Sequence, residues 1–193
     1  MKTTYKQIIV VSGLPRSGTS LMMKMLEAAG FELVVDHVRE ADEDNPRGYY
    51  ELEAVKQMKE GGADWVKDAS GKAVKVVAPL MQYLPHDRAY KVLFMRRAMP
   101  EILASQKQML IRRGQDPDAV PDEMMAQIFE KQLMDVLKWM ESSKHIEFVE
   151  IAYADLIAGE DEPLHQIQSL LGADTDLDAM RAMIDPKLYR QRA

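Results

Sequence analysis

The sequence predicts a three-layer α/β domain, in which helices cover both faces of a doubly wound, mainly parallel sheet of about five strands. Three observations support this fold. Short runs rich in β-branched and other apolar residues recur along the chain, helical segments lie between them, and the first run leads into a glycine-rich turn. Alternation of this kind is typical of parallel sheets with right-handed crossovers.

The strands are predicted where an apolar run is short enough to be covered on both faces. These runs are residues 7–12, 31–35, 73–78, 91–95 and 146–151. The helices are predicted in the longer segments between and after them. These segments are residues 19–29, 51–60, 100–112, 122–142, 163–171 and 176–183.

Length and composition limit the possible functions. A chain of 193 residues is long enough for one domain with a full core, so we expect a single domain over residues 1–193. The absence of cysteine excludes disulfides, thiol catalysis and thiolate metal sites, and a net charge of −6 disfavours nonspecific nucleic-acid binding. With no apolar run long enough for a bilayer and no room for a signal peptide before the first strand, we expect a cytoplasmic protein without nucleic-acid or membrane partners.

The turn after the first strand is the most specific feature of the sequence. Gly13 and Gly18 are spaced as in a Walker A loop, but Thr19 stands where that motif has lysine, and Arg16 supplies the positive charge from inside the loop. Backbone N–H groups at the start of the following helix attract anions. We therefore predict a P-loop-like cradle for phosphate or sulfate rather than an ordinary Mg²⁺-dependent NTPase site. A tight turn without a ligand is the alternative.

Further charged residues follow the predicted strands. In open parallel sheets, ligands bind beyond the carboxyl ends of the strands. Asp36 and His37 follow the second predicted strand, Arg97 follows the fourth, and Lys75 lies within the third, from which its long side chain would have to reach the edge. Arginines gathered at strand ends of an acidic protein predict a small polyanion as ligand.

These features resemble the PAPS-dependent sulfotransferases, in particular their bacterial and Golgi-type branch (PAPS is 3′-phosphoadenosine 5′-phosphosulfate). Residues 14–20 are similar to the family's 5′-phosphosulfate loop. Residues 94–97, with Ser105 eight positions after Arg97, are similar to its 3′-phosphate site. Residues 153–156 and 170–172 are similar to its C-terminal strand and helix.

The resemblance implies that PAPS is the sulfuryl donor and that PAP, adenosine 3′,5′-bisphosphate, is the product. It implies a hydroxyl or amine acceptor on a small molecule, glycan or lipid, and no metal. An arginine and a serine one helical segment apart can together bind a phosphate, which is consistent with a second anion site that distinguishes PAPS from ATP. The cofactor-binding residues expected on this basis are Pro15, Arg16, Ser17, Gly18, Thr19, Ser20, Lys75, Arg97 and Ser105.

The catalytic residues are less well defined. Arg16 is expected to stabilise charge on the leaving oxygen. Val77 occupies the position at which cytosolic members of the family carry their catalytic histidine, so the base must lie elsewhere. The candidates, in order of preference, are Asp36, in register with the catalytic glutamate of the tyrosylprotein branch, then Glu51 in the turn segment of residues 45–51, and His37.

Two other functions are compatible with the sequence. A P-loop kinase that uses ATP and Mg²⁺ would share the first loop, although Thr19 replaces the Walker lysine and no Walker-B carboxylate is evident. A protein that binds PAP or another nucleotide without turnover would explain the missing histidine. Binding of PAP compared with that of ATP and Mg²⁺ separates the donor classes.

Overall fold

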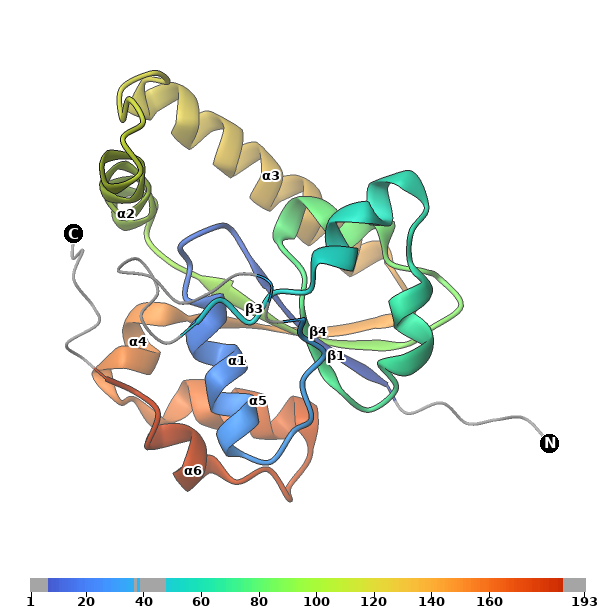
Figure 1. The fold of residues 1–193 in the computed structure, drawn as a ribbon. Coiled ribbons are helices and arrows are strands. Elements are labelled where there is room, and N and C mark those ends of the chain that lie inside the picture. The colour runs from blue at the N-terminus through green and yellow to red at the C-terminus, as the bar shows by residue number, and fades with distance from the viewer. Residues whose placement is uncertain (1–6, 37, 39–47, 186–193) are drawn as a thin grey trace.

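Four parallel strands form the central sheet in the computed structural model, which describes residues 7–36, 38 and 48–185 (Figure 1). They are β1 (Ile8–Gly13), β2 (Ala73–Lys75), β3 (Tyr90–Arg96) and β4 (Ile146–Ala152), in the spatial order β2-β1-β3-β4. The predicted parallel α/β fold is therefore confirmed.

The segment predicted as a fifth strand, residues 31–35, forms only an isolated parallel bridge between Leu33 and Ala73. The Ala73 N–H donates to the Glu32 carbonyl, and the Val34 N–H donates to the Ala73 carbonyl, each over 2.8 Å. The Asp36 N–H donates instead to the Glu51 carbonyl at 3.2 Å, because the chain has already turned away from β2. An apolar run predicts that a segment is buried beside the sheet, but it does not determine how many backbone hydrogen bonds the segment forms with the neighbouring strand.

Helices cover both faces of the sheet, as Figure 1 shows. One face is covered by α1 (Thr19–Ala28), α4 (Tyr153–Ala158), α5 (Asp161–Leu171) and α6 (Leu177–Arg181). The other is covered by three 3₁₀ helices, η1 (Glu53–Glu60), η2 (Asp64–Asp68) and η3 (Ala78–Tyr83), and by α3 (Asp122–Ser142). Alternate residues of β1 enter the two cores: Ile8 and Val10 enter one, and Ile9 and Val11 enter the other.

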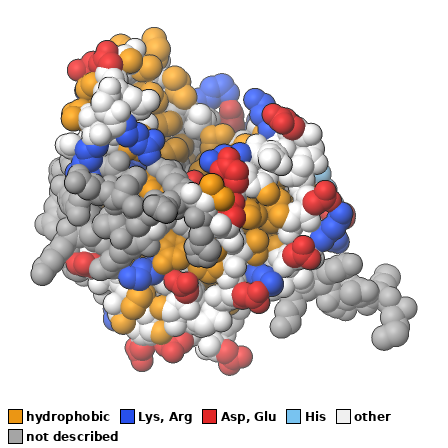
Figure 2. Space-filling view, viewed as in Figure 1, with side chains coloured by type: hydrophobic (Ala, Val, Ile, Leu, Met, Phe, Trp, Pro, Cys, Tyr) orange, Lys and Arg blue, Asp and Glu red, His pale blue; other side chains and the backbone are white. Residues whose placement is uncertain are grey.

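A third, smaller apolar cluster joins Leu14 of the glycine-rich loop to Ile102 of α2 (Met99–Arg112) and Phe129 of α3. Farther out on α3, Met124 and Ile128 are exposed. Figure 2 shows apolar side chains at the surface in the upper part of the molecule, where Figure 1 places α3. Thus α2 and α3 are anchored to the sheet next to the loop.

The longer predicted helices are present at or near their expected boundaries, whereas short elements are less well predicted. The segment 51–60 is a 3₁₀ helix that begins at Glu53, and η2, η3 and α4 were not predicted as separate helices. Elements of five or six residues, such as these three, are too short to show an apolar period. Within residues 7–36, 38 and 48–185, no helix has both the length and the apolar character that a membrane crossing requires.

Candidate functional site

The carboxyl ends of all four strands meet along one edge of the sheet. Gly13 of β1 pairs with Met95 of β3, and Arg96 at the end of β3 pairs with Ala152 at the end of β4. From β1 the chain continues to β2 on one side and later to β3 on the other, so the strand order reverses between β1 and β3. This is the position at which doubly wound sheets bind ligands.

The loop after β1 has the backbone conformation of a tight cradle. Gly13 and Gly18 adopt positive φ angles of 147° and 99°, and Arg16, although not a glycine, adopts 68°. A Cβ at Gly13 would lie 2.8 Å from the Met95 carbonyl oxygen, and one at Gly18 would overlap the Tyr153 ring. Both glycines are therefore required by close contacts as well as by their dihedral angles.

Two predicted ligand residues of the loop also have structural roles. The hydroxyl and the N–H of Ser17 both donate to the Leu14 carbonyl, over 2.7 and 3.2 Å, so this side chain closes the loop on itself. Gly18 is the N-cap of α1, and Pro15 is exposed at the tip. The backbone N–H groups of the first helical turn, which begins at Thr19, have no partners within the helix and suit an anion.

The structure brings Arg16, Arg97 and Ser105 together, although they come from three segments of the chain. Arg16 Nε donates to Ser105 Oγ over 2.9 Å, and Arg97 Nη1 donates to the carbonyl oxygen of Arg16 over 2.9 Å. Arg97 follows β3 directly, and Ser105 lies on α2. The sequence suggested two anion sites, and their proposed residues are in contact here.

Two further residues on this side of the loop have no functional role in the sequence prediction. Glu101 Oε2 accepts from Arg97 Nε over 2.8 Å, and the side chains of Arg97 and Glu101 are only 9% and 6% exposed. The Arg97 guanidinium lies 4.8 Å from the centroid of the Tyr153 ring, and burial raises the pKa of that phenol. The i,i+4 spacing of Arg97 and Glu101 could have indicated their ion pair, but no local signal pairs Arg97 with Tyr153.

On the other side of the loop, Lys75 reaches the same edge from the end of β2. Its side chain is 5% exposed, and its ammonium group donates to the Tyr49 carbonyl and, over 3.4 Å, to Ser20 Oγ. Glu51 Oε1 lies 3.5 Å from the same ammonium nitrogen, and the Glu51 side chain is 23% exposed. Lys75 therefore fixes residues 49–51 against the start of α1.

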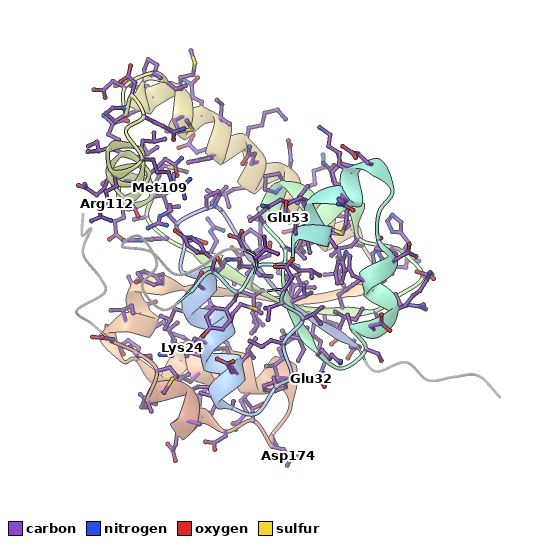
Figure 3. All side chains as sticks on the ribbon, viewed as in Figure 1. Lys24, Glu32, Glu53, Met109, Arg112 and Asp174 are labelled. Carbon is purple, nitrogen blue, oxygen red and sulfur yellow. The ribbon has the colours of Figure 1, made fainter. Side chains whose placement is uncertain are left out.

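Asp36 has a different environment from the one expected of a general base. Its carboxylate accepts from the backbone N–H of Glu53 over 2.5 Å and from that of Val38 over 3.1 Å. Glu53, labelled in Figure 3, is the first residue of η1. The Glu53 hydrogen bond is the main cause that lowers the pKa of Asp36 below its ordinary value. These bonds make Asp36 a weaker base and favour Glu51, while His37 lies outside the described residues.

No family model matches the sequence, and no curated protein matches it. Among solved structures, the sulfotransferase domain of the olefin synthase from Synechococcus PCC 7002 matches with a TM-score of 0.55 and 16% identity, over 100% of this chain and 91% of that one. The chain shares the fold of that sulfotransferase domain. A sulfotransferase domain from the curacin biosynthetic pathway matches at a TM-score of 0.47 and 15% identity, over 97% of this chain and 79% of the other. Likeness at these identities concerns the fold alone.

Proposed function

We propose that the protein is a sulfotransferase that transfers a sulfuryl group from PAPS to a hydroxyl or amine acceptor. The observation that carries this proposal is the meeting of Arg16, Arg97 and Ser105 beside an N-terminal helix turn, in a chain with the fold of a sulfotransferase domain. Such an arrangement suits a ligand that carries two anionic groups on one molecule, as PAPS does in its 5′-phosphosulfate and 3′-phosphate.

In the proposed complex, the loop from Gly13 to Ser20 holds the 5′-phosphosulfate. Arg97 and Ser105 hold the 3′-phosphate, which ATP lacks. Arginine presents planar paired donors and serine a hydroxyl donor, and both side chains are held near the loop before a ligand arrives. The site therefore favours PAP over ATP.

The transfer step needs an attacking atom in line with the leaving group. The acceptor oxygen or nitrogen forms a bond to sulfur, the bond from sulfur to the 5′-phosphate oxygen breaks, and PAP departs with the electron pair. Arg16 stabilises the charge that develops on this oxygen. The acceptor proton passes to a base, for which Glu51 is the preferred residue because its carboxylate is partly open to solvent and is placed by Lys75.

Calorimetry with PAP, AMP, and ATP with Mg²⁺ tests the choice of donor. PAP is expected to bind without metal and about 30- to 1,000-fold more tightly than AMP, the effect of about 2–4 kcal/mol from a charge-assisted phosphate contact. AMP is the matched control because it differs from PAP only in the 3′-phosphate. Equal or tighter binding of ATP with Mg²⁺ would favour the kinase, and tight PAP binding without turnover of PAPS on any acceptor would favour the binding protein.

A further inference from the structure

Arg16 is held from outside the loop at two points. Arg97 donates to its carbonyl oxygen, and Ser105 accepts from its side chain, each over 2.9 Å. Between these two contacts, the Arg16 backbone adopts a φ angle of 68°. A residue with a Cβ rarely adopts this left-handed conformation unless its surroundings impose it. The two external contacts are well placed to impose it here.

Arg97 is itself held by two neighbours. Glu101, one helical turn later, accepts from its Nε, and the centroid of the Tyr153 ring lies 4.8 Å from its guanidinium carbon. The Nε bond to Glu101 and the Nη1 bond to Arg16 use two directions of the same planar group, so the first contact fixes the direction of the second. The orientation of Arg97 therefore depends on Glu101.

The distribution of charge also indicates that Arg97 depends on Glu101. Arg16 and Arg97 bring two positive groups to one edge of the sheet, and Arg97 is almost fully buried. The Glu101 carboxylate lies 2.8 Å from Arg97 and compensates one of these charges in the protein without ligand. The loop can thus hold its binding conformation before any anion is present.

We propose that Glu101 is a positioning residue, which acts through Arg97 to hold Arg16 in the left-handed conformation that shapes the anion loop. Glu101 thereby sets how strongly the loop binds its ligand, without contacting the ligand. The identity of that ligand as PAP rests on the proposed function, whereas the effect on the loop does not.

Hydrogen exchange measured by NMR tests the effect on the loop directly. The Ser17 amide, which donates to the Leu14 carbonyl inside the loop, is expected to exchange at least about 10-fold faster in Glu101→Gln, while the amide of Val10 in β1 keeps its rate. Asp135→Asn is the matched control, because Asp135 and Lys131 also form an i,i+4 pair, but at 66% and 72% exposure. An unchanged Ser17 rate, or equal acceleration of both amides, would overturn the proposal.

Arg97→Lys provides a second variant if Glu101→Gln folds poorly. Lysine keeps the positive charge beside Glu101, but it lacks the paired donors that reach both Glu101 and the Arg16 carbonyl. The Ser17 amide is expected to exchange faster in this variant as well, again with Val10 unchanged. Wild-type exchange at Ser17 would show that Arg97 does not hold the loop.

A double-mutant cycle for PAP affinity tests whether Glu101 acts through Arg97. We expect Glu101→Gln alone to weaken PAP binding about 10-fold, Arg97→Ala alone to weaken it more, and the double variant to match Arg97→Ala. Losses that multiply would contradict the proposal. If the wild-type protein does not bind PAP, the proposed function fails, and the exchange rate of Ser17 still decides the role of Glu101.

Discussion

The two flanks of the proposed anion-binding loop, residues 13–20, each pair a cation with a carboxylate, but they bury these groups differently. On the Arg97 flank (Arg97, Glu101, Ser105 and Tyr153), both charged side chains of the ion pair are less than a tenth exposed. On the Lys75 flank (Lys75, Ser20 and residues 49–51), the lysine is buried, but Glu51 is 23% exposed and lies at the longer distance of 3.5 Å.

This difference suggests a division of roles around one loop. A carboxylate that is buried and closely paired serves to orient its partner. A carboxylate that is loosely paired and open to solvent can exchange a proton with an incoming molecule. We therefore expect the Arg97 flank to govern binding and the Lys75 flank to govern turnover.

The largest expected effect is on turnover, in the variant Glu51→Gln. If Glu51 is the base, as proposed, its loss should lower the maximal rate of sulfuryl transfer by about 10²–10⁴-fold and leave PAP affinity nearly unchanged. Transfer of labelled sulfate from PAPS to an accepted substrate measures the rate, and calorimetry measures the affinity. Asp36→Asn serves as the control and should stay close to wild-type activity, and a large loss there would instead restore Asp36 as the base.

The next effect is on binding, in the variant Arg97→Ala. PAP affinity should fall by about 2–4 kcal/mol, because the proposed charged contact from Arg97 to the 3′-phosphate is lost. Adenosine 5′-phosphosulfate, which has no 3′-phosphate, should also bind less tightly, since Arg97 supports the Arg16 carbonyl. Calorimetry with both ligands makes the comparison, and an unaltered affinity for adenosine 5′-phosphosulfate would limit Arg97 to the 3′-phosphate.

A smaller effect is expected on stability in Lys75→Met. The Tyr49 carbonyl loses its buried ammonium donor and keeps the longer hydrogen bond from Ser20 Oγ at 3.3 Å, so the free energy of unfolding should fall by about 1–3 kcal/mol. Urea unfolding followed by circular dichroism provides the measurement. The control is Lys56→Met, because Lys56 pairs with Glu53 at 56% and 52% exposure and should change stability by less than about 0.5 kcal/mol. Equal losses in the two variants would mean that the Lys75 contacts do not hold this flank.

The smallest effect is expected from Asp36→Asn, and it depends on pH. The pKa of Asp36 is lowered from 3.8 in the folded protein, so its stabilisation is complete above that value and is lost as the pH falls through the lowered pKa. Near neutral pH the variant should lose less than about 1 kcal/mol, because the carboxyl is partly exposed. Urea unfolding at neutral and strongly acid pH should show that the difference disappears in acid. If the variant lost the same free energy of unfolding at both pH values, the effect would not come from the ionised carboxylate.

The sequence predicted the parts of the site that depend on neighbouring residues. Gly13 and Gly18 identified the loop because their spacing and the following helix are local features, and the spacing of Arg97 and Ser105 placed both on one strand-to-helix connection. The carbonyl contact from Arg97 to Arg16 could not be predicted, because it joins segments far apart in the chain.

Asp36 and residues 31–35 show the same limit in two other ways. A carboxylate after an apolar run suggests a reactive group at the end of a strand. The Asp36 carboxylate instead accepts from the backbone N–H of Glu53, the first residue of η1. Residues 31–35 are apolar enough for a strand. The number of backbone hydrogen bonds that they form with β2, however, depends on where the chain turns away from β2. Both outcomes are set by tertiary packing rather than by local propensity.

The Tyr153 ring lies so near Gly18 that a Cβ there would overlap it, and this has a consequence for the order in which the parts of the loop fold. Gly18 belongs to an early part of the chain, whereas Tyr153 begins α4 after the last strand of the sheet. During synthesis, β1 and α1 emerge from the ribosome long before this aromatic support. We therefore expect the loop of a nascent chain to reach its proposed anion-binding form late, when β4 has docked and Tyr153 lies beside Gly18.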